Sequence, residues 1–316
     1  MAQSAELAAT LSATIDPQPW AKLYQGDRWA PLQINETVAL PQQTVCKSAG
    51  SSSDCEGRDA LEFLFYHHAG GVALELGGID GKAASETRVL ELHANFKRVI
   101  IEADPNARNK RRRASPTVLG VTAAVCSSAG WKHYLHHRMT SGLVEFMPDT
   151  FLRRWYPKLA RMRPHLQPIN DWSKVNFTDV GVRHPITRVA CVPLTDILEH
   201  IGIRHIHFAI LDTEGSELEI LSAVDFRRVS FGCLVIEVFS SNFGSRPVTY
   251  AAEVDAFLTN ASGGQYRQIF PPGKDPRLGG LRGRNLWFLH RDFVAHARAP
   301  RGGVFSWALP RPNQFR

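Results

Sequence analysis

The chain has 316 residues, of which 44% are hydrophobic and 21% charged, with a formal net charge of +7. Such a composition indicates a globular protein with a sizeable core and excludes a disordered or low-complexity chain. No apolar stretch approaches the roughly 20 residues that cross a membrane, and the N-terminal residues do not resemble a signal peptide. We therefore expect a cytoplasmic protein without a membrane span.

The five cysteines cannot all pair within one chain. Cys126, Cys191 and Cys233 lie in apolar segments, where we expect buried thiols. Cys46 and Cys55 flank a polar loop, "KSAGSSSD", across which a disulfide is geometrically conceivable. The sequence leaves that pairing open.

Residues 1–56 show little periodicity and predict an irregular N-terminal extension. Helices and strands are then expected to alternate, with Ser85 as the N-cap of the second helix. The predicted order is a helix over 58–69, a strand over 71–76, a helix over 84–95, a strand over 97–105, a short helix over 106–113 with an exposed basic run over 108–113, a strand over 117–126, a strand over 205–212, a helix over 216–223 and a strand over 231–239.

This alternation predicts an α/β fold with a doubly wound, mostly parallel sheet. Residues 266–270 and 284–290 are expected to complete the sheet as an antiparallel pair. We assign one domain to residues 57–297 and expect residues 298–316 to form a flexible tail.

The interval 127–190 is too long for an ordinary crossover between strands and predicts an insertion. Within it, residues 151–162 have helical spacing, with a kink expected at Pro157. This helix either packs on the sheet or covers an acceptor pocket, with Arg153, Arg154 or Arg161 near an anionic group. The sequence does not decide between these alternatives.

The first central strand ends in "ELGGIDG", which contains Glu75, Gly77, Gly78, Asp80 and Gly81. Glycines at a strand end let a ligand approach the backbone. The dinucleotide pattern G-x-G-x-x-G does not fit, because isoleucine occupies its second glycine position. A carboxylate just before the loop would also repel a pyrophosphate, whereas it suits a cationic amine.

The second strand ends at Glu102, where a carboxylate can accept hydrogen bonds from the two ribose hydroxyls of an adenosine. A contact of Glu75 with an amine and of Glu102 with a ribose would fit S-adenosylmethionine better than NAD. That ligand has an adenosine and an amino-acid moiety but no phosphate.

Six segments in the same order resemble the FkbM-type methyltransferase family. They are "VALELGGIDGKAASETRVLE", "RVIIEADP", "VTAAVCS", "CVPLTDIL", "FAILDTEGSELEILSAVDF" and "LVIEV". The resemblance implies a class I, Rossmann-like methyltransferase fold that uses S-adenosyl-L-methionine to methylate a hydroxyl on a small molecule or glycan. It also implies that the loop of Glu75, Gly77, Gly78, Asp80 and Gly81 holds the donor, that Glu102 contacts the ribose, and that Ala123–Ala124 borders the adenine. "LGGID" replaces the commoner "IGAND", and the insertion also departs from the family pattern.

The segment "LDTEGSELEIL" (211–221) places four carboxylates after a predicted strand. Asp212 at the strand end is the expected catalytic residue, as a general base or as a metal ligand. Glu214 is expected to orient the acceptor. Glu217 and Glu219 belong to the first turn of the next helix, where the helix dipole favours negative charge. Dependence on a divalent metal stays open.

Other functions have weaker support. His133 and His137 are four residues apart, a spacing that brings two metal ligands together only if the segment is helical. No acidic third ligand is nearby, so we predict no metal site there. No basic–aromatic module indicates a nucleic-acid partner. The alternative function is a non-catalytic methyltransferase fold used in interaction or trafficking. The acceptor and the oligomeric state are not readable from the chain.

Overall fold

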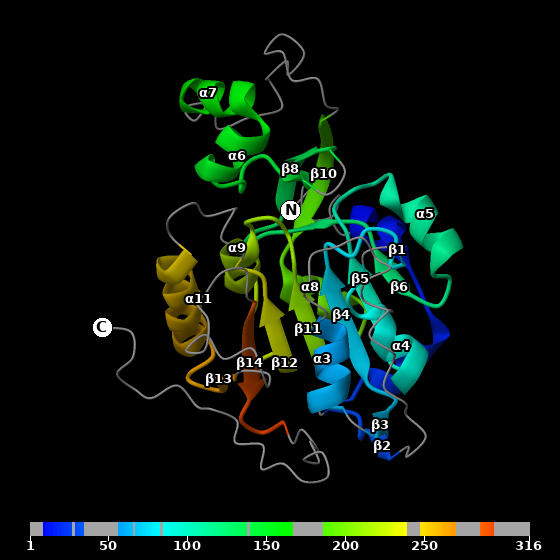
Figure 1. Ribbon diagram of the computed structural model, residues 1–316. Coiled ribbons are helices and arrows are strands. Elements are labelled where there is room, and N and C mark those ends of the chain that lie inside the picture. Colours follow the sequence, from blue (N-terminus) through cyan, green and yellow to red (C-terminus); the bar gives the residue numbers. More distant parts are fainter. Residues whose placement is uncertain are drawn as a thin grey trace.

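The computed structural model describes residues 9–26, 29–34, 56–65, 67–82, 85–137, 140–166, 186–238, 247–269 and 285–293. The expected tail, and Cys46 and Cys55 with their possible disulfide, lie outside these ranges. Two larger sheets stand one above the other, with the second beyond the carboxyl ends of the central strands (Figure 1). The predicted helices and strands are largely present, with bounds shifted by a few residues.

The central sheet has eight strands and is mixed. Its middle pairings, from β6 to β12, are parallel, and its edge pairings are antiparallel. The α/β class and the C-terminal antiparallel pair are therefore confirmed, whereas a mostly parallel, doubly wound sheet is not. In spatial order the strands are β1 (Ile15–Asp16), β6 (Leu119–Val121), β5 (Lys97–Ile101), β4 (Val72–Leu76), β11 (His205–Leu211), β12 (Ser230–Ile236), β14 (Leu286–His290) and β13 (Tyr266–Ile269).

Two hydrophobic cores lie against the central sheet. Side chains alternate between the faces of a strand, so Leu74 and Leu76 enter one core while Ala73 enters the other. The first core includes residues of α8 (Leu194–His200), α9 (Glu217–Ser222), α11 (Pro247–Ala261) and the 3-10 helix η1 (Pro19–Tyr24); the second includes residues of α3 (Glu56–Phe63) and α4 (Arg88–Ala94).

The described part of the insertion contributes strands to a second sheet, whose order is β7 (Ala124–Val125), β10 (Ile186–Val192), β8 (Gly130–Leu135) and β9 (Gly142–Leu143). The helices α6 (Asp149–Trp155) and α7 (Pro157–Leu166) pack against it through a core that includes Phe151 and Leu135. The predicted kink at Pro157 is a complete break between these helices. A short pair, β2 (Gln33–Ile34) with β3 (His68–Ala69), and the helix α5 (Ala107–Ala114) complete the elements.

Four expectations from the sequence are wrong. The segment 117–126 is not one strand, because β6 joins the central sheet and β7 the second sheet. Ser85 is not an N-cap, since α4 begins only at Arg88. Cys126 and Cys191 are not free thiols, because they form a disulfide that joins neighbouring strands β7 and β10. Cys233 is a buried free thiol, as expected.

The fourth wrong expectation concerns the basic run 108–113, which is not wholly exposed. Arg111 is buried and, with Arg108 and Arg112, forms an ion pair with Asp16 of β1. Much of the basic run thus attaches an edge strand to the fold.

Disulfides are typical of oxidising compartments, so the bond gives no support to the cytoplasmic location. Among the described residues, no helix has the length and apolar character that a bilayer crossing needs.

Candidate functional site

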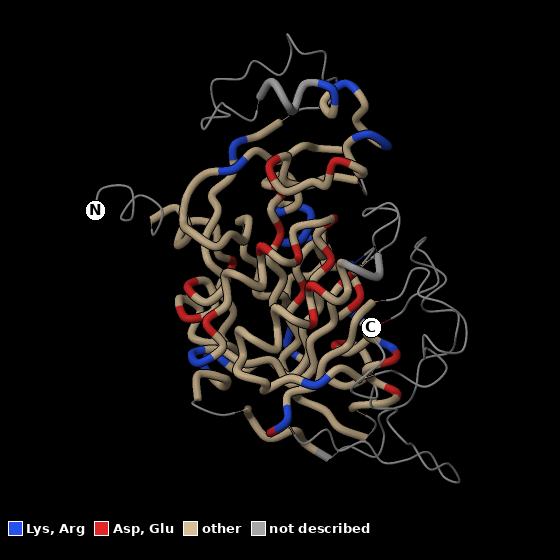
Figure 2. Tube along the Cα trace, turned by 90° about the vertical axis from the view of Figure 1, so that its left-hand side faces the viewer, with Lys and Arg blue, Asp and Glu red and all other residues tan. Residues whose placement is uncertain are grey.

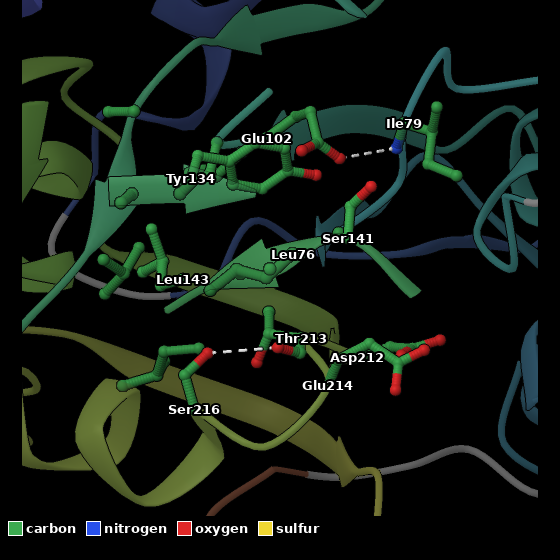
Figure 3. A pocket seen from close by; sticks show the side chains of 18 residues that line it. Leu76, Ile79, Glu102, Tyr134, Ser141, Leu143, Asp212, Thr213, Glu214 and Ser216 are labelled. Atoms are coloured by element: carbon green, nitrogen blue, oxygen red, sulfur yellow. Dashed lines mark hydrogen bonds between the residues drawn. The ribbon is translucent and has the colours of Figure 1, made fainter. Parts of the chain in front are cut away.

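A cavity of about 800 Å³, counted with the part open to solvent, lies at the carboxyl ends of the central strands. Its walls come from the ends of β4, β5 and β11, from β6–β7 and from the second sheet. Ligands of open α/β sheets bind at this position. The lining residues are Leu76, Gly77, Ile79, Ile101, Glu102, Ala103, Ala123, Ala124, Val125, Tyr134, Ser141, Gly142, Leu143, Asp212, Thr213, Glu214, Ser216 and Ile220 (Figure 3).

Glu102 is held rigidly in one wall. Its two carboxylate oxygens accept hydrogen bonds from the backbone N–H groups of Ile79 (3.0 Å) and Asp104 (2.8 Å). Burial raises the pKa of Glu102, while these two N–H groups lower it. The hydroxyl of Tyr134, from the second sheet, lies beside this carboxylate (Figure 3). Glu102 is therefore a fixed acceptor that faces the cavity.

Gly77 brings the first strand end close to Asp212. Its φ is +88°, and a Cβ at this position would lie 1.9 Å from the carbonyl oxygen of Asp212. Only glycine fits so close an approach of two backbones. The glycine therefore allows the ends of β4 and β11 to approach each other beside the cavity.

Asp212 opens onto the cavity, and its carboxylate pairs with Glu237 at the tip of the neighbouring strand. Burial raises the pKa of Asp212, the hydrogen bond from Glu237 lowers it, and the charge of Glu75 raises it further. Burial and the charges of Asp212 and Glu217 raise the pKa of Glu237 well above its usual value. The raised pKa of Glu237 favours its protonated form, which can donate a hydrogen bond to the Asp212 carboxylate.

The loop 213–216 wraps around the carboxylate of Glu217. One oxygen accepts hydrogen bonds from the N–H groups of Thr213 (3.2 Å) and Gly215 (3.1 Å), and the other accepts from the hydroxyl of Tyr250 (3.1 Å). Glu214 adopts a left-handed φ of 58° and lines the cavity. Glu217 is fully buried, so its role is to shape the loop that presents Asp212 and Glu214.

Glu75 is engaged away from the cavity. It accepts hydrogen bonds from Ser85, from the N–H of Glu86 (2.9 Å) and from Thr87, and its carboxylate lies 3.7 Å from the guanidinium of Arg98. Strand alternation explains this, because Leu76 faces the cavity and its neighbour Glu75 faces the opposite side. A contact between Glu75 and the donor amine therefore has no support from this geometry.

The cavity brings together five of the nine predicted site residues: Gly77, Glu102, Ala124, Asp212 and Glu214. Gly78, Asp80 and Gly81 lie in the following loop, outside the lining, where Asp80 accepts a hydrogen bond from the N–H of Lys82 (2.8 Å). Tyr134, Ser141 and Thr213 were not predicted. Only Thr213, inside the acidic segment, carried a signal in the sequence.

Metal binding has no geometric support in the described ranges, where no group of three or more His, Cys, Asp and Glu side chains is placed to hold an ion. His133 and His137 do not share a helix face, because His133 lies on β8 and His137 follows that strand. His133 instead pairs with Glu145 at 2.8 Å. These findings concern the described residues and leave metal dependence open.

The protein is an α/β protein with a cavity at the carboxyl ends of its parallel strands. Comparison with protein families matches residues 75–266, more than half of the chain, to the methyltransferase FkbM domain. The chain therefore belongs to the FkbM methyltransferase family, as its sequence motifs indicate.

Among solved structures, the chain is similar to methyltransferase FkbM from Methylobacillus flagellatus KT, with 12% sequence identity and a TM-score of 0.37. The similarity covers 70% of this chain and 44% of that protein, so the chain spans less than half of that protein's length. No curated protein matches the chain. The family assignment depends on the domain match alone.

Proposed function

We propose that the protein is an S-adenosylmethionine-dependent O-methyltransferase that acts on a hydroxyl of a small molecule or glycan. The observation that carries the proposal is that Glu102 and Asp212 face one cavity at the strand ends. Among the described lining residues there is no Lys or Arg. Such a lining suits a cationic ligand with an adenosine and disfavours a cofactor with phosphates, such as NAD.

The residues present fit S-adenosylmethionine. Glu102 has its carboxylate fixed by two backbone N–H groups and is placed to accept hydrogen bonds from ribose hydroxyls. Ala123 and Ala124 give a small apolar wall for an adenine. Asp212 and Glu214 supply negative charge opposite a sulfonium. When bound, S-adenosylmethionine supplies an electrophilic methyl group.

Asp212 is the proposed general base. An acceptor hydroxyl held against its carboxylate loses its proton to Asp212 as the oxygen forms the new bond to carbon and the carbon–sulfur bond breaks. Glu214 orients the acceptor from the same loop. The surrounding walls align the reacting atoms, which is the main contribution of an enzyme to an in-line displacement.

Isothermal titration calorimetry with S-adenosylmethionine and S-adenosylhomocysteine tests the donor site. The E102Q variant loses the charged acceptor, which contributes about 1.5–3 kcal/mol, so we expect affinity to fall roughly 10- to 150-fold. E62Q, on the partly exposed face of α3, is the matched control and should bind normally. If the wild-type protein binds neither ligand, or E102Q binds as tightly, the proposal is wrong.

Mass spectrometry of cell extracts incubated with the protein and isotopically labelled donor identifies the acceptor. Transfer of the label to an oxygen supports O-methylation, and transfer to nitrogen or carbon contradicts it. The alternative, a non-catalytic interaction or trafficking protein, predicts that D212N keeps the full biological effect. A small-molecule or glycan partner and a cytoplasmic location stay predictions until the acceptor is known.

A further inference from the structure

The positive charge of the chain is concentrated in the insertion. Residues 127–190 contain ten Lys and Arg against four Asp and Glu, an excess of +6 in a chain of net charge +7. The rest of the chain is therefore almost neutral. Positive charge concentrated in one segment indicates a surface that binds an anionic partner. Charge spread over the whole chain would instead mainly keep the protein soluble.

Part of this charge is exposed on α6 and α7, whereas Lys132 of β8 and Arg188 of β10 stack over the rings of Phe146 and Trp131. From Phe151 to Arg161 the exposed residues are Arg153, Arg154, Trp155, Pro157, Lys158 and Arg161. They comprise four cations, one tryptophan, one proline and no acid. We call these six residues the basic face.

Its cations have few partners among the described residues. The guanidinium of Arg153 lies 4.0 Å from Asp149, and both side chains are largely exposed. The guanidinium of Arg154 stacks over the ring of Trp155 at 5.1 Å. Trp155 remains 42% exposed, although burial of a tryptophan is usually favourable. The basic face therefore combines solvent-exposed positive charge with an accessible aromatic ring.

The helices that carry the basic face pack against the second sheet through buried side chains. Phe151, Leu152 and Leu159 are buried in a core that they share with Leu135 of the second sheet. The hydroxyl of Tyr156, at the break between α6 and α7, donates a hydrogen bond to the carbonyl oxygen of Thr140 (2.6 Å). The helices of the basic face are thus held in place by a buried core and by this hydrogen bond.

The basic face also lies at the functional end of the molecule. α6 and α7 stand beyond the carboxyl ends of the central strands (Figure 1), the strand ends that line the cavity. Lys and Arg positions recur along this end, with acidic positions just below them, and further basic positions occur at the opposite end (Figure 2). A partner bound there would be near the acceptor side of the cavity.

We propose that the basic face of α6 and α7 docks the protein on an anionic lipid bilayer. Clustered Lys and Arg are attracted by anionic headgroups, and the amphipathic tryptophan ring is suited to the headgroup level. A single strand of nucleic acid fits less well, because its usual site is a basic groove with several aromatic rings. This inference goes beyond the proposed function and does not depend on it.

Sedimentation with large unilamellar vesicles tests the docking, with phosphatidylcholine alone in one set and phosphatidylcholine plus phosphatidylglycerol in the other. We expect binding to the anionic set only, and release by high salt, which screens exposed charges. In the R153Q/R154Q/K158Q/R161Q variant, the affinity for anionic vesicles should fall by more than about tenfold. W155A should weaken binding by a smaller factor.

The matched control is K110Q/R113Q/R267Q/R291Q, which removes the same charge from exposed positions on other elements. It should bind the anionic vesicles nearly as well as the wild-type protein. The docking proposal is overturned if the wild-type protein does not bind the anionic vesicles or binds both sets equally. It is likewise overturned if the control loses as much binding as the basic-face variant, or if single-stranded RNA binds more tightly at the same salt. Since the assay needs neither donor nor turnover, its failure is distinguishable from failure of the proposed methyl transfer.

Discussion

Asp212 and Glu237 are neighbours because two adjacent parallel strands both end in carboxylates. Leu211 pairs with Ile236 in the register of β11 and β12, which brings the next residue of each strand to the same sheet edge. Two carboxyl groups this close share a proton, and the pair titrates as a unit. A proton on Glu237 would give Asp212 a hydrogen-bond donor and would keep Asp212 ionised, as its proposed role as a base requires.

The D212N variant should lose activity, with kcat lower by about 10²- to 10⁴-fold, since it lacks the proposed base. In the wild-type protein, kcat should rise with pH as Asp212 ionises. Its raised pKa places that rise above the pH expected for an isolated aspartate, whose pKa is about 3.9. A kcat–pH profile measures both effects.

Two further variants complete this test. D196N, on the exposed side of α8, should be normal. E237Q preserves a donor to Asp212 but cannot ionise, so it should keep the acid-side rise and lose any fall at alkaline pH. An unchanged kcat in D212N would exclude Asp212 as the base.

Glu86 provides a test of folding electrostatics beside the site. Burial and the charges of Glu56, Glu75 and Asp212 raise the pKa of Glu86 from 4.5 to about 9. The folded protein therefore binds this proton more tightly than the unfolded chain does. The free energy of unfolding should fall as pH rises from about 4.5 to about 9, and this contribution should be constant outside that window.

E86Q removes the ionisation and should be more stable than the wild-type protein at roughly pH 8, by up to about 5 kcal/mol, since each pKa unit corresponds to about 1.4 kcal/mol. Near pH 4 the two proteins should be equally stable, because Glu86 is then protonated in both states. Urea unfolding at a series of pH values measures the difference, and E62Q should leave the wild-type dependence intact. A constant difference between E86Q and wild type at all pH values would contradict this account.

At the scale of elements, the sequence predicted what depends on local pattern. Apolar runs located β4, β5, β11 and β12, and the rule that ligands bind at strand ends then identified Glu102 and Asp212. The rule does not say on which side of the sheet each side chain emerges. Glu75 was therefore expected at the cavity, whereas it faces α4.

The second sheet could not be predicted, because its pairings join distant segments. β7 and β10 are more than 60 residues apart in the chain, and nothing local specifies their register. Tyr134 and Ser141 were missed for that reason, since they reach the cavity only through this sheet. The same distance hid the pairing of Cys126 with Cys191, whose sequence separation is 65.

The disulfide should be a main stabiliser of the second sheet. It closes a long loop and lies directly after Val125, a residue of the cavity wall. Closure of a loop of this length contributes about 2–4 kcal/mol, chiefly by restricting the unfolded chain. We expect C126A/C191A to lose about that much free energy of unfolding in urea. Dithiothreitol should destabilise the wild-type protein and leave the variant unchanged; an equal response of both would show that the bond is absent in solution.

At the scale of the whole molecule, the cavity joins two sheets that have separate cores. The central sheet contributes Glu102 and Asp212, and the second sheet contributes Tyr134, Ser141 and Leu143. A donor in this cavity would contact both. Donor binding should therefore stabilise the second sheet as well as the central one.

Hydrogen–deuterium exchange measures this coupling. At one hundred times its Kd, S-adenosylhomocysteine adds about 2.7 kcal/mol to the stability of whatever unfolds together with its site. Amides of β8 and β10 should then exchange more slowly, together with those of β4 and β5. Y134F removes the hydroxyl beside Glu102 and should weaken protection of the second sheet more than that of the central sheet. Protection confined to the central strands would show that the insertion moves independently of the donor site, and its cavity-lining residues would then serve the acceptor alone.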